Sequence, residues 1–141
     1  MCIKWCPDAK PDEKEGNRGR LFTGGLDNYI HAYDMKTMTE DYSTKSNQDV
    51  AKEMCEKCKK MQEEVHHCAE ILDLLVIPEH KLIASASADS NMCLWDMSTL
   101  KGKSIHTNHE KKIYSLDWVE NQKLILSAGL DHDIYIWNPI V

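Results

Sequence analysis

Short apolar stretches recur along the whole chain, and polar or turn-forming residues separate each of them from the next. The runs around MCLW (92–95) and IYIW (134–137) alternate in the way that is typical of antiparallel strands with one buried face. Ile3 and Trp5 are predicted to point inward from the first strand. The pattern predicts an all-β chain with strands at 1–7, 21–25, 29–34, 37–44, 70–77, 81–86, 91–96, 102–107, 112–119, 123–128 and 133–138.

Three stretches repeat one pattern: LFTGGLDNYIHAYDM (21–35), LIASASADSNMCLWDM (82–97) and LILSAGLDHDIYIWNP (124–139). Each is an apolar strand ending in small residues, then an Asp, then a second strand that closes on an aromatic residue. The Asp recurs after 62 and then 42 residues. A recurring spacing near 40 residues indicates a repeat architecture, and the longer first step leaves an insertion between the first two units.

Polar and aromatic residues stand at fixed offsets from these Asp residues. A Ser or Thr lies four positions earlier, an aromatic residue six positions later and, in two units, a His 22 positions earlier. The sets are His67, Ser85, Asp89 and Trp95, then His109, Ser127, Asp131 and Trp137, with Thr23, Asp27 and Tyr33 in a first unit that has no such His.

The motifs LWD (94–96), IWN (136–138) and the degenerate AYD (32–34) resemble those of the WD40 β-propeller family, and the resemblance covers nearly the whole chain except about 36–65. It implies an all-β propeller fold, with about three blades of a larger, seven- or eight-bladed ring, to which the sequence adds one inserted amphipathic helix. The expected parts are a partial first blade (1–35), an outer strand with the helical insertion (36–66), a second blade (67–108) and a third blade without its outer strand (109–141). We therefore expect the chain to be an excerpt of a longer protein.

The resemblance also assigns a role to the recurring polar residues. In the family, the indole, hydroxyl, imidazole and carboxylate form a hydrogen-bonded chain, so His67 and its counterparts are expected to be structural tetrads. A Ser-His-Asp set could also indicate a hydrolase. However, catalysis needs one exposed nucleophile, and a set repeated from unit to unit favours architecture, so no catalytic residue is predicted.

The inserted segment 48–66 has apolar residues at helical spacing, at Val50, Met54, Cys58, Met61 and Val65. It predicts an amphipathic helix that packs on the propeller or on a partner, with Met54 and Met61 as candidate contacts. Zinc is the less favoured alternative, because a CxxC inside a continuous helix is a weak signal. Its ligands would be Cys55, Cys58, His66 and Cys68.

Composition narrows the classes of function further. The formal net charge is −6 with 17 basic residues, which argues against nucleic-acid binding. Neither a membrane-length apolar run nor a signal peptide is found in the sequence, and the six cysteines have no disulfide-like spacing. No cofactor, nucleic acid or membrane is predicted, and a reducing compartment is expected.

The third unit, with SAGLDHDIYIWNP (127–139), resembles blades of WD-repeat proteins of cilia and flagella. This implies a non-catalytic scaffold of the axoneme, associated with microtubules, cytoskeleton and other axonemal subunits. The alternatives are a cytosolic WD40 adaptor or substrate receptor in another complex, and an enzyme or enzyme subunit that uses Cys55 and Cys58 or an exposed Ser-His pair. Candidate partner-binding residues are the turn positions Glu70, Ala88, Lys111, Lys112, Leu130 and His132.

Overall fold

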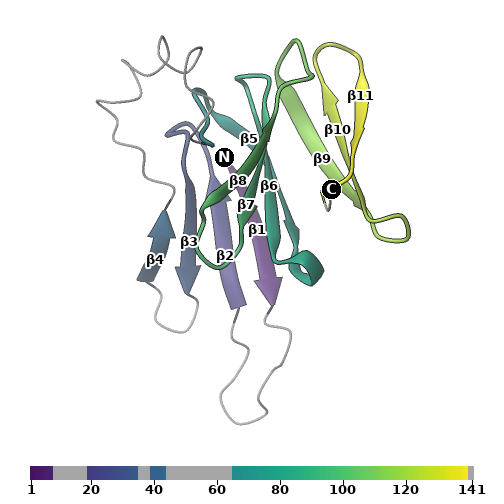
Figure 1. Ribbon diagram of the computed structural model, residues 1–141. Coiled ribbons are helices and arrows are strands. Elements are labelled where there is room, and N and C mark those ends of the chain that lie inside the picture. Colours follow the sequence, from purple (N-terminus) through teal and green to yellow (C-terminus); the bar gives the residue numbers. More distant parts are fainter. Residues whose placement is uncertain (8–18, 35–38, 44–64, 140–141) are drawn as a thin grey trace.

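The computed structural model describes residues 1–7, 19–34, 39–43 and 65–139, and these form three antiparallel sheets (Figure 1). In each sheet, neighbouring strands along the chain pair with one another. The first sheet contains β1 (Cys2–Pro7), β2 (Gly19–Gly24), β3 (Ile30–Asp34) and β4 (Thr39–Ser43). The second contains β5 (Ile71–Ile77), β6 (Leu82–Ser87), β7 (Met92–Asp96) and β8 (Gly102–His106), and the third contains β9 (Ile113–Val119), β10 (Leu124–Gly129) and β11 (Ile134–Trp137).

The predicted all-β fold is confirmed, and every strand lies within two residues of its predicted bounds. The turn chemistry explains why the bounds recur. Asn28, Ser90 and His132 each have a positive φ, of 66°, 69° and 67°, directly after the Asp of the turn between the second and third strands. Because each of these residues is in the left-handed region, the three turns reverse the chain at the same point of the repeat.

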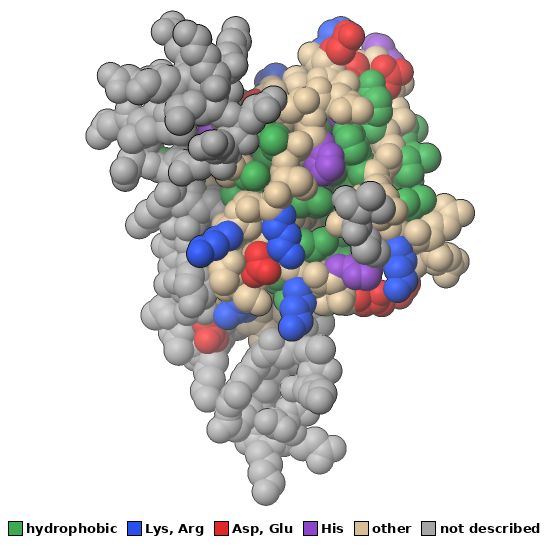
Figure 2. Space-filling model, viewed as in Figure 1, with side chains coloured by type: hydrophobic (Ala, Val, Ile, Leu, Met, Phe, Trp, Pro, Cys, Tyr) green, Lys and Arg blue, Asp and Glu red, His purple; other side chains and the backbone are tan. Residues whose placement is uncertain are grey.

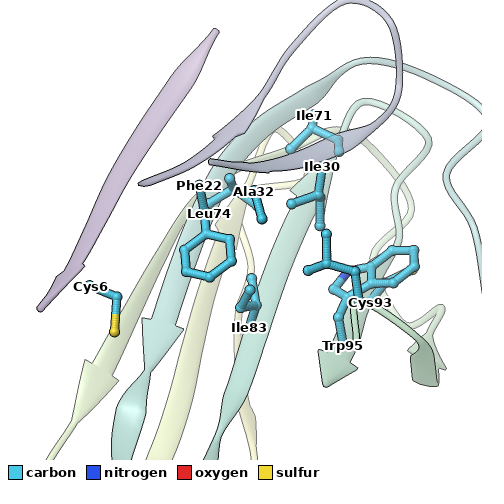
Figure 3. Close-up of a cluster of buried hydrophobic side chains, with 10 residues drawn as sticks. Cys6, Phe22, Ile30, Ala32, Ile71, Leu74, Ile83, Cys93 and Trp95 are labelled. Atoms are coloured by element: carbon cyan, nitrogen blue, oxygen red, sulfur yellow. The ribbon is translucent and has the colours of Figure 1, made fainter. Parts of the chain in front are cut away.

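One apolar cluster joins the first sheet to the second (Figure 3). The first sheet contributes Phe22, Ile30 and Ala32, which are fully buried. They lie against large side chains of the second sheet, including Leu74 and Ile83. Each sheet has only one layer of strands, so it can bury its apolar face only against a neighbouring sheet.

A second apolar cluster repeats this arrangement between the second and third sheets. The second sheet now presents its other face, and the third sheet covers it. The second sheet contributes the buried residues Ile77, Leu82, Ala84, Ala86, Met92 and Leu94, and the third contributes Ile113, Leu116, Ile125 and Trp137.

One face of the first sheet is more exposed than the sequence predicted. Ile3 and Trp5 were predicted to point inward, but they are 53% and 43% exposed, because their face of the first sheet has no neighbour among the described residues.

The predicted helix 48–66 lies outside the described residues, except for Val65 and His66, which form no helix. Val65 packs against the first apolar cluster instead. In the described part of the chain no helix is long and apolar enough to cross a membrane.

Asp73 on β5 connects all three sheets. Its Oδ2 accepts a hydrogen bond from the Leu116 amide on β9, at 2.8 Å, and its Oδ1 accepts one from the Leu74 amide, at 2.9 Å. The ammonium of Lys4 on β1 lies 3.7 Å from the same Oδ1. The side chain is only 17% exposed. Its carboxylate therefore takes the place of water as the acceptor for two backbone amides, at the point where β5 lies between β1 and β9.

We predict that Asp73→Ala lowers the free energy of unfolding by about 1–3 kcal/mol, because it leaves a half-buried amide without its acceptor. Asp117→Ala is the matched control. The Asp117 carboxylate is exposed and accepts a bond only from the adjacent Trp118 amide among the described residues, so we expect a change within about 0.5 kcal/mol. Urea unfolding followed by circular dichroism measures both, and equal losses would contradict a role for Asp73 between sheets.

Candidate functional site

The second sheet brings its four repeated polar residues together in one hydrogen-bonded chain. Trp95 Nε1 on β7 lies 2.7 Å from Ser85 Oγ on β6, and Ser85 Oγ lies 2.6 Å from His67 Nε2. His67 Nδ1 lies 3.0 Å from Asp89 Oδ2, in the turn between β6 and β7. The chain thus joins the loop before β5, strands β6 and β7, and the turn between them.

The third sheet repeats the arrangement. Trp137 Nε1 is 2.8 Å from Ser127 Oγ, and His109 Nε2 is 2.7 Å from the same oxygen. His109 Nδ1 is 2.7 Å from Asp131 Oδ2. The 22-residue separation between His and Asp therefore spans the same contact in both sheets.

The two ends of each chain allow one consistent direction of donation. A carboxylate can only accept, so the imidazole donates its Nδ1 proton to it, and Nε2 can then accept from the Ser hydroxyl. An indole can only donate, so the hydroxyl oxygen accepts from Trp. Every polar hydrogen of the chain has an acceptor in this assignment, which offsets the cost of burying it.

The Asp89 carboxylate also binds the backbone, both in its own turn and in the loop before β5. Asp89 accepts from the Cys68 amide at 2.8 Å and from the Asn91 amide at 2.9 Å. Burial would raise the pKa of Asp89, but the hydrogen bond and charge interaction with His67 and these two amides outweigh it and lower the pKa. The pKa of Asp131 is also lowered, against the effect of burial, by the hydrogen bond from His109 and the Glu110 amide.

These Ser-His-Asp contacts have the distances of a hydrolytic triad but a different environment. The side chains of Ser85 and Ser127 are 0% and 1% exposed, and each hydroxyl oxygen already accepts a bond from an indole. A nucleophile must reach a substrate carbonyl and have a lone pair directed at it. Burial separates both hydroxyls from any substrate, and the arrangement is suited to holding strands together.

The first sheet uses a different partner for its Asp. His31 Nε2 on β3 lies 2.7 Å from Asp27 Oδ2, and the His31 ring stacks on Tyr33 with centroids 6.4 Å apart. The sequence reasoning missed this pair, because it looked for a His before the first strand. The sequence could have indicated this pair, because His31 stands four residues after its Asp, as Cys93 and Tyr135 do in the other two units. Cys93 and Tyr135 lie beside the tetrad His of their own sheets.

The candidate partner-binding residues lie at the end of the sheets where the second and third strands are joined (Figure 1). The Ala88 amide donates to the Glu70 carbonyl, and the Leu130 amide donates to the Lys112 carbonyl, both at 2.9 Å. The ammonium of Lys112 also lies 3.5 Å from the carboxylate of Glu70. The turn rim, as we call this surface, thus consists of Glu70, Ala88, Lys111, Lys112, Leu130 and His132, of which Lys111, Lys112, Leu130 and His132 are exposed.

Leu26 extends the rim and was not among the predicted residues. It precedes Asp27 as Ala88 precedes Asp89 and Leu130 precedes Asp131, and its side chain is exposed. The three side chains therefore occupy one repeat position across the three sheets. Comparison of the repeats could have identified Leu26 from the sequence.

The candidate zinc ligands are only partly described. Cys55 and Cys58, like the candidate contacts Met54 and Met61, lie outside the described residues. His66 is half-buried and Cys68 is exposed. No group of three or more possible metal ligands is found in the described part of the chain.

We predict that Trp137→Phe lowers the free energy of unfolding by about 1–2 kcal/mol, because Ser127 loses its indole donor and the ring buries less area. Tyr33→Phe should cost less, since the described residues form no complete tetrad in the first sheet and Tyr33 instead stacks on His31. Denaturant unfolding of the two variants gives the order, and a larger loss for Tyr33→Phe would contradict the role given to the tetrad.

Comparison with known proteins agrees with the repeat. The family described as "WD domain, G-beta repeat" matches residues 58–96 and 102–138. Among solved structures, one titled as a humanized mutant of the Chaetomium thermophilum Polycomb Repressive Complex 2 bound to the inhibitor GSK126 is similar, with a TM-score of 0.68 and 21% identity. The match covers 97% of this chain and 26% of that one, and shows likeness of fold.

The chain is also similar to several curated proteins. It is 34% identical over 83 residues to cilia- and flagella-associated protein 337 B of Tetrahymena thermophila, covering 59% of this chain and 7% of that protein. It is 25% identical over 125 residues to autophagy-related protein 16 of Arabidopsis thaliana, covering 88% and 21%. Protein HIR1 of Kluyveromyces lactis is 24% identical over 147 residues, covering 93% and 16%.

The chain thus spans less than a quarter of the length of these three curated relatives. Since the family matches two adjacent segments that together exceed half of the residues, the chain belongs to the WD40 repeat family.

Proposed function

We propose that this chain is a non-catalytic scaffold that binds other proteins through the turn rim. The observation that carries the proposal is the contrast between the two kinds of polar residue. The tetrad residues are buried and bonded to one another, whereas four of the six rim residues, Lys111, Lys112, Leu130 and His132, are exposed. A rigid framework that presents side chains at its end is suited to binding.

Within this proposal, the three sheets are blades of a larger propeller, with the boundaries 1–35, 36–66, 67–108 and 109–141. Propellers typically close with 4–8 blades, and a ring of seven or eight would cover the open faces of the first and third sheets. The insertion in 36–66 then lies between two blades, where Met54 and Met61 offer further partner contacts.

We further propose that the partners are subunits of the ciliary or flagellar axoneme, which is built on microtubules. The support is the similarity to the Tetrahymena cilia- and flagella-associated protein, which has the highest identity of the three curated relatives described above. A cytosolic adaptor or substrate receptor in another complex is the alternative, and the longer but weaker matches to an autophagy-related protein and to HIR1 favour it.

We predict that the chain, expressed with a tag in a ciliated cell, stays with axonemes after detergent extraction. Lys111→Glu combined with Leu130→Glu should reduce this retention about tenfold or more, because exposed anchor residues at a binding surface contribute more than about 1–2 kcal/mol. Both side chains are exposed, so the fold should survive.

Glu120→Lys combined with Gln122→Glu is the matched control. These residues lie in the turn between β9 and β10, at the opposite end of the sheet, and are also exposed (Figure 1). Retention should be unchanged. If the tagged chain is recovered in soluble complexes and not with axonemes, the alternative replaces the axonemal proposal. If the rim variant and the control variant stay with axonemes to the same extent, the rim is not the binding surface.

A further inference from the structure

Three lysines gather at the end of the second sheet that is opposite to the turn rim. The Lys81 carbonyl accepts a hydrogen bond from the Met97 amide, and the Lys101 carbonyl accepts one from the Asp96 amide, both at 2.9 Å. The Lys103 ammonium lies 3.7 Å from Oδ2 of Asp96. The three lysines, which we call the basic cluster, are therefore held around the point where β7 ends.

The lysines of the basic cluster are accessible to a partner. All three are exposed, and no carboxylate of the described residues lies within ion-pair distance of Lys81 or Lys101. Figure 2 shows basic side chains around a single acidic one on the lower left part of the described surface. Sheets pack on both sides of the second sheet, so this exposure belongs to the loop end of the sheet and not to an uncovered side.

The Asp96 carboxylate balances only part of this charge. Its Oδ1 accepts hydrogen bonds from the amides of Ser98 and Thr99, at 2.9 and 3.0 Å, and its Oδ2 faces Lys103. These amides lower the pKa of Asp96, so the group is ionised at neutral pH and contributes one negative charge. Three ammonium groups thus surround one carboxylate whose hydrogen-bonding capacity is largely used by its own turn.

The other charged residues at this end belong to neighbouring elements. Glu79 lies in the short 3-10 helix η1 (Pro78–His80) and forms no ion pair among the described residues. Asp34 lies opposite Arg20 in the register of β3 and β2. The Arg20 guanidinium adds positive charge beside the cluster, since it donates to the Met97 carbonyl at 3.4 Å.

We propose that the basic cluster binds a short acidic segment of a partner protein, whose Asp or Glu carboxylates pair with Lys81, Lys101 and Lys103. The formal net charge of the whole chain is −6, so a local positive surface stands out against an acidic molecule. Because exposed charges are screened beyond about 8 Å, a short segment meets mainly the cluster. The fixed backbone around β7 presents the lysines without a large ordering cost.

Longer polyanions fit this surface less well. Nucleic acid is bound through many phosphate contacts, and anionic membranes are typically bound by about four to eight clustered basic residues. Either of them would also meet the acidic remainder of the chain, which repels it. A short acidic peptide is therefore the partner that the charge distribution favours. The proposal goes beyond the turn rim, because it gives the opposite end of the sheet a partner of its own.

Fluorescence anisotropy of a fluorescein-labelled decaglutamate peptide, titrated with the 141-residue chain, tests the proposal. Lys101→Glu with Lys103→Glu should weaken binding about tenfold or more, because an exposed ion pair contributes up to about fivefold and the new charges repel the peptide. Lys101→Gln with Lys103→Gln should give a smaller loss in the same direction. Binding by the unmodified chain should also weaken several-fold between about 0.05 M and about 0.5 M salt.

Lys111→Glu with Lys112→Glu is the matched control. It makes the same change of net charge at the turn rim, so binding should stay within about twofold of the unmodified chain. Circular dichroism checks that each variant keeps its β structure. Equal losses in the cluster and rim variants would show a general effect of charge and would overturn the proposal.

Two further outcomes would also overturn it. One is a folded, unmodified chain that does not bind the peptide, or that binds it equally at low and high salt. The other is tighter binding to a single-stranded DNA oligonucleotide or to phosphatidylserine vesicles, lost in the cluster variant. The assay contains no axonemes, so failure here and loss of the rim's axoneme retention are separate results.

Discussion

The structure depends on a chain of buried hydrogen bonds from an indole through a serine and a histidine to a carboxylate. In the second sheet this chain fixes four segments of sequence relative to one another: the loop that holds His67, the strand of Ser85, the turn of Asp89 and the strand of Trp95. Each group is buried, so breaking one contact leaves its partner unpaired away from water. The interaction therefore specifies the register of the sheet as well as stabilising it.

The exposed surface follows from this buried framework. Asp89 accepts the Cys68 and Asn91 amides, and Asp131 accepts the Glu110 amide, so each turn is bound to the loop before the first strand of its sheet. This holds the side chains beside the two turns in a repeated row. The carboxylates keep a lowered pKa, so they stay ionised at neutral pH and the turn keeps its charge-assisted bonds. Scaffold function of the kind proposed needs such fixed positions more than it needs reactive groups.

Much of the fold and of the tetrads could be predicted from the sequence, because few other residues could take the places of His, Ser, Asp and Trp in the repeat. The spacing of His, Ser, Asp and Trp placed the strands within two residues and brought the right side chains together. Contacts between sheets were harder. Asp73 accepts the Leu116 amide through an approach of the backbone that no side-chain pattern encodes. The pairing of His31 with Asp27 departs from the arrangement in the other two sheets, and only comparison of the repeat positions could have indicated it. Ile3 and Trp5 alternate as predicted, but alternation does not say whether a neighbouring sheet covers the face.

Hydrogen exchange of the four tryptophan indoles tests the buried tetrads most directly. Trp95 and Trp137 donate to Ser85 and Ser127, whereas Trp5 is exposed and Trp118 is half-buried, with no indole hydrogen bond found to the described residues. Two-dimensional NMR of the indole N–H groups in deuterated water should therefore show two slowly exchanging signals, assigned to Trp95 and Trp137, and two fast ones. Equal exchange of all four, or protection of Trp5 and Trp118 instead, would contradict the tetrads as the framework of this chain.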